Sequence, residues 1–209
     1  AAVDDLGEGV ARAEILIIRG QAHLGLRQFD QSADAFREAD RLNPRDVRAK
    51  VGLAQGLVNQ GKVKDAEIEV DIALSRKPKS TEALALKGEL RRLRRDLKGA
   101  VAHFDKALGV NGNNVLARLG RAASLIDLNR EDEAADDIQA VFRRVPGHPL
   151  ATYLSALVMA KKKDWAGVQE ALQSVGRALD NHMPSIFLSG AVHYAQNQLE
   201  QAVRKLERY

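Results

Sequence analysis

The stretch that decides the fold is residues 81–110, which read TEALALKGELRRLRRDLKGAVAHFDKALGV. A small residue, Gly88, stands in the middle of its first half, and a large apolar residue, Phe104, stands in its second half. In both halves apolar residues recur three and four positions apart, which is the spacing of one helix face. The stretch therefore predicts two helices joined by a polar turn, over roughly Glu82–Arg94 and Lys98–Val110.

The same pattern returns every 34 residues, without an insertion or deletion. The small residue of the first helix recurs as Gly20, Ala54, Gly88, Ala122, Ala156 and Gly190. Three columns of the second helix keep the same period: Ser32, Ala66, Ala100, Ala134, Val168 and Ala202; Phe36, Val70, Phe104, Ile138, Leu172 and Leu206; and Ala39, Ala73, Ala107, Val141, Val175 and Tyr209. A helix breaker ends the first four repeats, at Pro44, Pro78, Gly112 and Pro146. The repeats are residues 13–46, 47–80, 81–114, 115–148, 149–182 and 183–209, after a leading segment of residues 1–12.

These columns resemble the tetratricopeptide repeat (TPR) family over nearly the whole chain. The resemblance implies an all-α fold, a right-handed superhelical solenoid of about six helix-turn-helix repeats. It also implies a scaffold that binds a protein or peptide partner. One such helix pair cannot bury its apolar face alone, so stacked neighbours bury it together.

Two columns of the first helix depart from the family pattern. The leucine that usually precedes the small residue appears only as Leu53; its equivalents are Arg19, Lys87, Arg121, Ser155 and Ser189. Three residues earlier the chain varies as Leu16, Lys50, Leu84, Arg118, Thr152 and Ile186. We expect these departures to leave the fold intact and the interior less aromatic than in a typical member.

The composition narrows the possible functions. The 209 residues contain 32 Lys and Arg against 28 Asp and Glu, a formal net charge of +4, and no cysteine. Without cysteine, a disulfide framework, a thiolate metal site and a cysteine nucleophile are excluded. The charge surplus is too small to indicate general nucleic-acid binding. No apolar stretch approaches the ~20 residues of a membrane-spanning helix.

No set of residues in the sequence converges on a catalytic, metal or cofactor site. The five histidines form neither a pair four residues apart nor the HExxH spacing of a zinc helix. The segment 109–114 lacks the lysine of a phosphate-binding loop and is typical of a turn between repeats. The sequence therefore predicts a protein that is not an enzyme and that uses no cofactor or metal.

The TPR resemblance implies that the first helices line a concave groove. In the first three repeats the groove positions are polar and include Arg48, Gln55 and Glu89. In the last three repeats they are apolar: Leu116, Leu119, Leu150, Tyr153, Leu157, Phe187 and Tyr194. We expect this apolar part to bind an extended or helical segment of a partner. The alternative is that some of these side chains pack between repeats.

Two basic clusters end the first helices of the third and fifth repeats. They are Arg91, Arg92, Arg94 and Arg95 in one, and Lys161, Lys162 and Lys163 in the other. Cations favour the C-terminal end of a helix, which is a sufficient explanation. The alternative is a basic rim that binds an anionic partner, such as an acidic protein, an anionic polysaccharide or lipid headgroups. Nucleic acid is disfavoured, because only Trp165 lies close enough to stack on bases.

Uncovered apolar residues at both ends of the chain predict further repeats beside them. The run Ile15–Ile18 is apolar on all sides, and the last helix carries an apolar face of Leu199, Val203 and Leu206. We therefore expect the chain to be part of a longer array, with residues 1–12 as a leader or the tail of a preceding repeat. End-to-end self-assembly through the final face is a further alternative.

Two stretches resemble a narrower group of proteins. Residues 148–154 (HPLATYL) and 183–192 (MPSIFLSGAV) are similar to large TPR lipoproteins encoded beside bacterial exopolysaccharide and PEP-CTERM/exosortase sorting systems. That resemblance implies a periplasmic protein, anchored through a lipidated cysteine outside the present sequence. A cytoplasmic location is the alternative.

Overall fold

The computed structural model describes residues 2–207, without the side chains of residues 2–6 and of Arg177. These residues form twelve α-helices and one short 3₁₀ helix, and no strand occurs among them. The predicted all-α fold is confirmed. Tyr209, which the sequence assigns to the last column of the repeat, lies outside the described residues.

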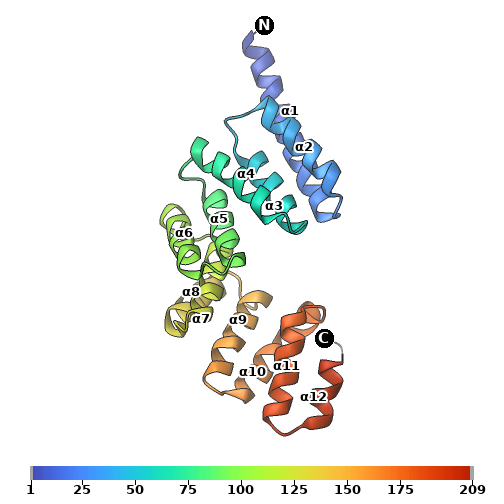
Figure 1. Cartoon of the computed structure of the whole chain (residues 1–209), viewed down its shortest axis with the longest axis vertical. Helices are drawn as coiled ribbons and strands as arrows, with labels where there is room; N and C mark the ends of the chain where they lie inside the picture. The colour runs from blue at the N-terminus through green and yellow to red at the C-terminus, as the bar shows by residue number, and fades with distance from the viewer. Residues whose placement is uncertain (1, 208–209) are drawn as a thin grey trace. The chain divides into compact units, whose positions relative to one another are not determined.

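The chain divides into two compact units, and the division falls between the third and fourth repeats (Figure 1). The helices of the N-terminal unit, Ala1–Asn114, are α1 (Ala2–Gly25), α2 (Phe29–Leu42), α3 (Arg48–Asn59), α4 (Val63–Arg76), α5 (Thr81–Leu93) and α6 (Leu97–Val110). Those of the C-terminal unit, Val115–Tyr209, are α7 (Val115–Asp127), α8 (Glu131–Arg144), α9 (Pro149–Lys161), α10 (Trp165–Ser174), α11 (Met183–Ala195) and α12 (Leu199–Leu206), with the 3₁₀ helix Gly176–Leu179 after α10.

Odd-numbered helices are the first helices of the repeats, here called A helices, and even-numbered helices are the B helices. Each A helix packs against the B helix that follows it, and within a unit each B helix packs against the next A helix. In the third repeat, α5 and α6 begin and end within one residue of the predicted boundaries. The helix pairs predicted from the 34-residue period are therefore confirmed.

Residues 2–12 form the first turns of α1, which continues without a break to Gly25. No proline or turn sequence interrupts this stretch, so the helix has no reason to end near residue 12. In the apolar run, Ile17 is buried beside Phe36, whereas Ile15 and Ile18 are exposed on α1.

Every A helix ends in the same way. The residue after its C-cap has a left-handed backbone, with φ between 57° and 75°, at Arg27, Gly61, Arg95, Asn129, Lys163 and Asn197. The next N–H then bonds to a carbonyl five residues back; in the third repeat Asp96 N donates to Arg91 O at 2.9 Å. Asp96 is also the N-cap of α6, and its carboxylate accepts from Gly99 N at 2.9 Å. One pair of residues thus ends one helix and starts the next.

Close contact between A and B helices explains the column of small residues. The ring of Phe36 lies between α1 and α3: a Cβ atom added at Gly20 would lie 2.7 Å from it, and one added at Gly52 would lie 2.3 Å from it. Both distances are too short for carbon atoms, so the buried ring requires glycine on both neighbouring helices. In the third repeat a Cβ atom added at Gly88 would likewise lie 2.8 Å from the ring of Phe104.

The size of the B-helix residue matches the size of its A-helix partner. Repeats with phenylalanine in the B helix have glycine in the A helix, whereas Val70 and Ile138 stand opposite Ala54 and Ala122. All four of these residues are buried. Complementary volumes keep the packing dense in each repeat, although the residues differ.

The contact between Gly88 and Phe104 predicts a coupled pair of substitutions. Gly88→Ala lowers the free energy of unfolding by about 1–3 kcal/mol. The added methyl group displaces the Phe104 ring, and this costs more energy than alanine gains in helix propensity. Phe104→Leu vacates that space, so the double variant loses less than the sum of the single variants, by about 0.5–3 kcal/mol. Urea denaturation measures all three. Gly109→Ala, on α6 with open space around it, is the control and loses nothing.

The left-handed residues predict a stabilising substitution. Lys163 has φ of 61°, a conformation that a side chain disfavours and glycine adopts readily. Lys163→Gly raises the free energy of unfolding by about 0.5–1 kcal/mol in thermal or urea denaturation. Lys163→Ala removes the same charge but keeps the Cβ atom and brings no such gain. Equal effects of the two substitutions would contradict this explanation.

Candidate partner-binding surfaces

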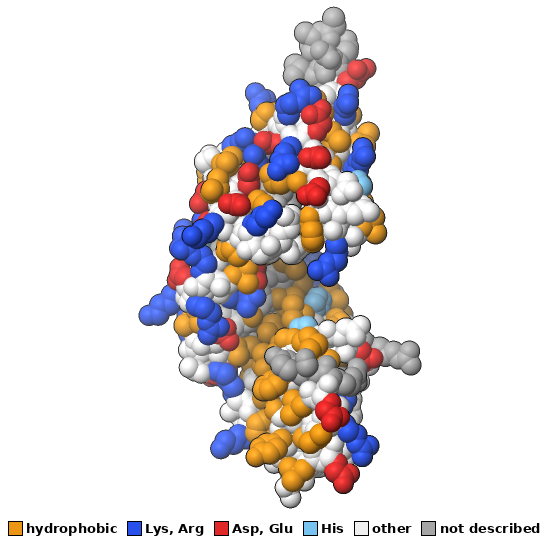
Figure 2. Space-filling model, turned by 45° about the vertical axis from the view of Figure 1, so that its right-hand side comes forward, with side chains coloured by type: hydrophobic (Ala, Val, Ile, Leu, Met, Phe, Trp, Pro, Cys, Tyr) orange, Lys and Arg blue, Asp and Glu red, His pale blue; other side chains and the backbone are white. Residues whose placement is uncertain are grey.

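The A helices of the C-terminal unit carry an apolar surface. Leu116 on α7 is 72% exposed, and Phe187 and Tyr194 on α11 are 52% and 70% exposed. Leu150, at the same position of α9 as Leu116 of α7, is exposed as well. Figure 2 shows hydrophobic side chains gathered on this unit. Large apolar side chains exposed together are typical of a binding surface.

Two half-buried residues of α9 belong to the same surface. Tyr153 packs edge-to-face on the His182 ring, with the centroids 4.8 Å apart and the planes at 75°. Burial raises the pKa of the Tyr153 hydroxyl and lowers that of His182, so both rings are uncharged at pH 7. Leu157 packs against the buried cluster that joins α9, α10 and α11. We name the surface of Leu116, Leu150, Tyr153, Leu157, Phe187 and Tyr194 the apolar face.

Leu119 does not belong to the apolar face, although the sequence places it in the groove. Its side chain is only 4% exposed and lies in the core of the C-terminal unit. The alternative that some groove positions pack between helices therefore holds for this residue. Neighbouring helices cover this position on α7, whereas the equivalent Phe187 on α11 is 52% exposed.

Two polar groove positions of the N-terminal unit, Arg48 and Glu89, are bonded to oppositely charged side chains. Arg48 donates to Glu14 on the neighbouring A helix at 2.9 Å, and also to Asp46, and these carboxylates raise its pKa. Glu89 accepts two hydrogen bonds from Arg92, at 2.9 and 2.6 Å. Gln55 is exposed on α3. This groove therefore offers a partner neutralised charges and one exposed amide.

The cations of the basic clusters are bonded to neighbouring carboxylates. In the third repeat Arg94 bonds to Glu67 at 2.6 Å, and Arg91 lies 3.8 Å from Glu67 and 3.4 Å from Asp96. Arg92 is the partner of Glu89, and Arg95 holds the left-handed position after α5. This cluster completes a helix end and compensates acidic residues.

The lysine cluster of the fifth repeat is arranged similarly. Lys161 Nζ donates to the Ile126 carbonyl at 2.7 Å and pairs with Glu131 at 3.0 Å, which lowers the pKa of that carboxyl. Lys162 lies 3.7 Å from Asp132, and Lys163 is exposed in the left-handed position after α9. Both clusters thus favour the simpler explanation, in which cations terminate A helices.

Buried ion pairs occupy the two columns that depart from the family pattern. Lys87 is buried and donates to Glu67 at 3.0 Å and Asp71 at 2.9 Å, both on α4. Asp137 on α8, 1% exposed, accepts from Arg118 at 2.8 Å and from Arg121 at 2.7 Å. The sequence showed the cations but not their partners, which lie 16 to 20 residues away.

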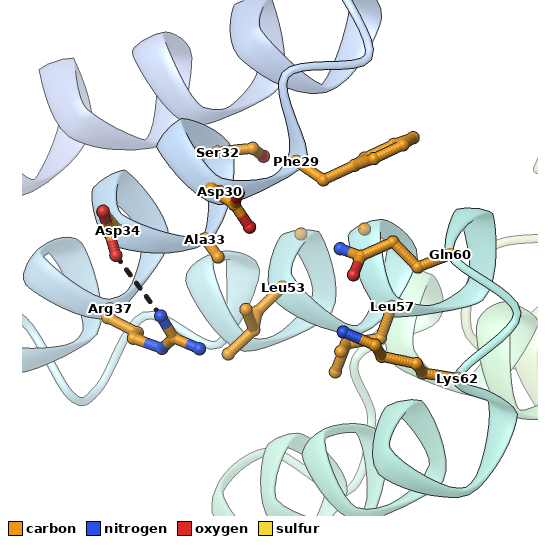
Figure 3. A pocket seen from close by; sticks show the side chains of 12 residues that line it. Phe29, Asp30, Ser32, Ala33, Asp34, Arg37, Leu53, Leu57, Gln60 and Lys62 are labelled. Atoms are coloured by element: carbon orange, nitrogen blue, oxygen red, sulfur yellow. Dashed lines mark hydrogen bonds and ion pairs between the residues drawn. The ribbon is translucent and has the colours of Figure 1, made fainter.

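A pocket of about 280 Å³ lies in the N-terminal unit between α2 and α3 (Figure 3). Ala33, Leu53 and Leu57 line it with apolar atoms, and its rim is polar. Two glycines of α3 one turn apart, Gly52 and Gly56, are among its lining residues. Sequence reasoning missed this pocket, although two glycines in one helix were a usable signal.

The part of the chain that the structure describes shows no metal site or membrane span. No group of three His, Asp or Glu residues there could hold a metal ion, and no helix is long and apolar enough to cross a membrane. His23 and His193, which occupy equivalent positions, each bond through Nδ1 to a glutamine five residues on, at 2.7 and 2.6 Å. These histidines thus brace the turn that follows their A helix.

Comparison with known proteins agrees with the helix pairs. The family model described as tetratricopeptide repeat matches residues 23–90. The TPR resemblance of the sequence is confirmed over these residues, and helix pairs continue before and after them. TPR proteins are generally non-catalytic scaffolds that bind protein or peptide partners.

The individual relatives are distant. Anaphase-promoting complex subunit 3 of Schizosaccharomyces pombe is 25% identical over 122 residues, which are 58% of this chain and 18% of that protein. The chain thus spans less than a fifth of that relative. The structure of Pseudomonas aeruginosa PilF has a TM-score of 0.77 at 14% identity, over 95% of this chain and 90% of that one. YrrB, described as a TPR protein with an unusual peptide-binding site, has a TM-score of 0.58 at 20% identity, over 82% and 88%.

The ion pairs of Glu67 predict a pH dependence of stability. The hydrogen bond from Lys87 lowers the pKa of the Glu67 carboxyl by more than burial raises it, and Arg94 lowers it further. A folded-state pKa below the unfolded value means that the unfolded chain binds the proton more readily. The stabilisation is therefore complete at pH 7 and is lost as the pH falls below about 4–5.

Substitution isolates this contribution. Glu67→Gln lowers the free energy of unfolding at pH 7 by about 1–3 kcal/mol, since the buried Lys87 keeps only Asp71 as a charged partner. The difference from wild type shrinks as urea denaturation is repeated from pH 7 down to about pH 3. Glu170→Gln, at an exposed position of α10, is the control with little effect at any pH. A difference that does not change with pH would refute the assignment.

Proposed function

We propose that this chain is a non-catalytic scaffold whose apolar face binds a segment of a partner polypeptide. The observation that carries the proposal is the exposure of Phe187 and Tyr194 on α11, beside the half-buried Tyr153. Aromatic side chains are the usual anchors of protein interfaces, because they bury a large area with few torsions to fix. The general role of TPR proteins as interaction scaffolds supports it.

The spacing on α11 favours an amphipathic helix as the bound segment. Phe187 and Tyr194 are seven residues apart, two helical turns, so their Cα atoms lie about 10 Å apart on one side of α11. A ligand helix repeats its apolar residues over the same distance, at i, i+3 or i+4, and i+7. The uncharged Tyr153 and His182 rings at the base of the face suit an apolar side chain better than a charged one.

Two stretches of sequence support a finer setting for this function. Residues 148–154 and 183–192, which resemble TPR lipoproteins of exopolysaccharide and protein-sorting systems, lie in or directly before α9 and α11. They contain Tyr153 and Phe187, two residues of the apolar face. On this resemblance we place the partner in a bacterial envelope system, with the chain on the periplasmic side.

Other candidate partners fit the surface less well. An anionic polysaccharide would meet basic clusters whose charges are largely compensated by Glu67, Glu89 and Glu131. End-to-end assembly is a second candidate, because Leu199 and Val203 are exposed on α12. A molecular mass independent of protein concentration in light scattering would argue against it.

Substitution of two aromatic residues tests the apolar face. Labelled amphipathic peptides, selected on an array with the wild-type protein, are titrated by fluorescence anisotropy. Phe187→Ala with Tyr194→Ala weakens binding by about 30-fold or more, the effect of removing an interface anchor. The melting temperature hardly changes, because exposed side chains contribute little to stability.

The control is Val203→Ala, an exposed apolar residue of the same unit on a B helix, and it leaves the affinity unchanged. The proposal is overturned if the double variant binds the peptides as well as wild type does, or if Val203→Ala weakens binding equally. It is also overturned if no amphipathic peptide binds the wild-type protein.

A further inference from the structure

Two glycines of α3, Gly52 and Gly56, line the pocket between α2 and α3. At the positions of Gly52 and Gly56, the other A helices of the third, fifth and sixth repeats carry buried aliphatic residues: Leu86 and Leu90, Leu154 and Val158, and Leu188 and Val192. In the third repeat Leu86 and Leu90 pack in one cluster with Ala66, Val70 and Ala73 of the preceding B helix. In the second repeat both positions are glycine and line the pocket, and the fourth repeat has Gly120 and Ser124 there.

Packing explains one of the two glycines and not the other. Gly52 is required by Phe36, whose ring would clash with any Cβ atom there. At Gly56 an added Cβ would meet only Leu24 Cδ1, at an ordinary 3.7 Å, and the backbone has no left-handed φ. Alanine would moreover favour the helix by about 1 kcal/mol. The fold alone thus gives no reason for glycine at position 56.

Polar groups around the opening come from opposite walls. Asp30 of α2 stands on one side, and Gln60 and Lys62, from the turn between α3 and α4, stand on the other (Figure 3). The end nearest Arg37 is closed by its ion pair with Asp34, at 3.3 Å. A hydrogen-bond acceptor therefore faces two donors across an apolar floor.

We propose that this pocket binds one leucine-sized side chain of an extended partner peptide. The side chain enters above Gly56 and contacts Leu53 and Leu57. The N–H group of the same peptide unit then donates to Asp30 on one wall. Its C=O group accepts from Gln60 or Lys62 on the other wall.

Size and charge both favour this occupant. A volume of about 280 Å³ is at the lower end for ligand pockets, which suits a single side chain rather than a cofactor. Asp30 and Lys62 together give the rim no net charge, so it selects against strongly charged ligands. The site is separate from the apolar face: it lies in the other unit, is lined largely by a B helix, and does not depend on the function proposed above.

A blocked amino acid tests the pocket directly. The ¹⁵N-labelled full chain is titrated with N-acetyl-leucinamide, and amide shifts are followed by NMR. We expect a Kd of about 1–10 mM, with shifts centred on the amides of Ala33, Gly52, Gly56 and Gln60. N-acetylglycinamide, which has the same peptide groups without the side chain, produces no such shifts.

Two variants separate binding from folding. Gly56→Leu fills the pocket as Leu90 does in the next repeat and abolishes the shifts, whereas the smaller Gly56→Ala retains part of them. Asp30→Lys changes only an exposed side chain and weakens binding about fivefold or more, so it tests the site even if Gly56→Leu fails to fold.

Three results would overturn the proposal. They are the absence of shifts at these amides in the wild-type protein, equal shifts with the glycine compound, and full binding by both Asp30→Lys and a folded Gly56→Leu. Shifts confined to the surroundings of Phe187 and Tyr194 would likewise reject this pocket, while supporting the apolar face.

Discussion

The structure depends on one contact, in which a large apolar side chain of each B helix enters a gap left by a small residue of its A helix. The Phe36 ring requires a residue without a Cβ atom at two places, Gly20 in its own repeat and Gly52 in the next. One ring therefore holds three helices together. Where the B helix has a smaller side chain, as at Val70, the A helix has alanine in place of glycine. The fold tolerates variation because volume is conserved at each contact, while residue identity is not.

Charged residues complete the interior where the apolar pattern fails. Lys87 and Arg121 stand where the TPR pattern has leucine, and each is bonded to carboxylates of a B helix. Burying a charge is unfavourable unless it is paired. The helices therefore pack favourably only in the register that places Glu67 opposite Lys87 and Asp137 opposite Arg121. Such pairs contribute more to the choice of one helix arrangement than to its total stability.

Much of this fold could be predicted from the sequence, because repeating columns report contacts that every repeat makes. The fourth repeat forms α7 and α8 in full, and Ala122 and Ile138 are buried there as the repeating columns predict. The surfaces were less predictable. Periodicity gives the position of Leu119 on its helix, but only the neighbouring helices determine that it is buried. The pocket between α2 and α3 likewise appears only once the surrounding helices are in place.

The shared turn between A and B helices explains why the period never varies. Because the left-handed residue Arg95 is followed at once by the N-cap Asp96, no slack residue separates α5 from α6. One inserted residue would turn the second helix by about 100° about its axis and direct Phe104 away from Gly88. An insertion or deletion inside this turn would therefore break the packing of its repeat, whereas the connection from a B helix to the next A helix has no such shared residue pair.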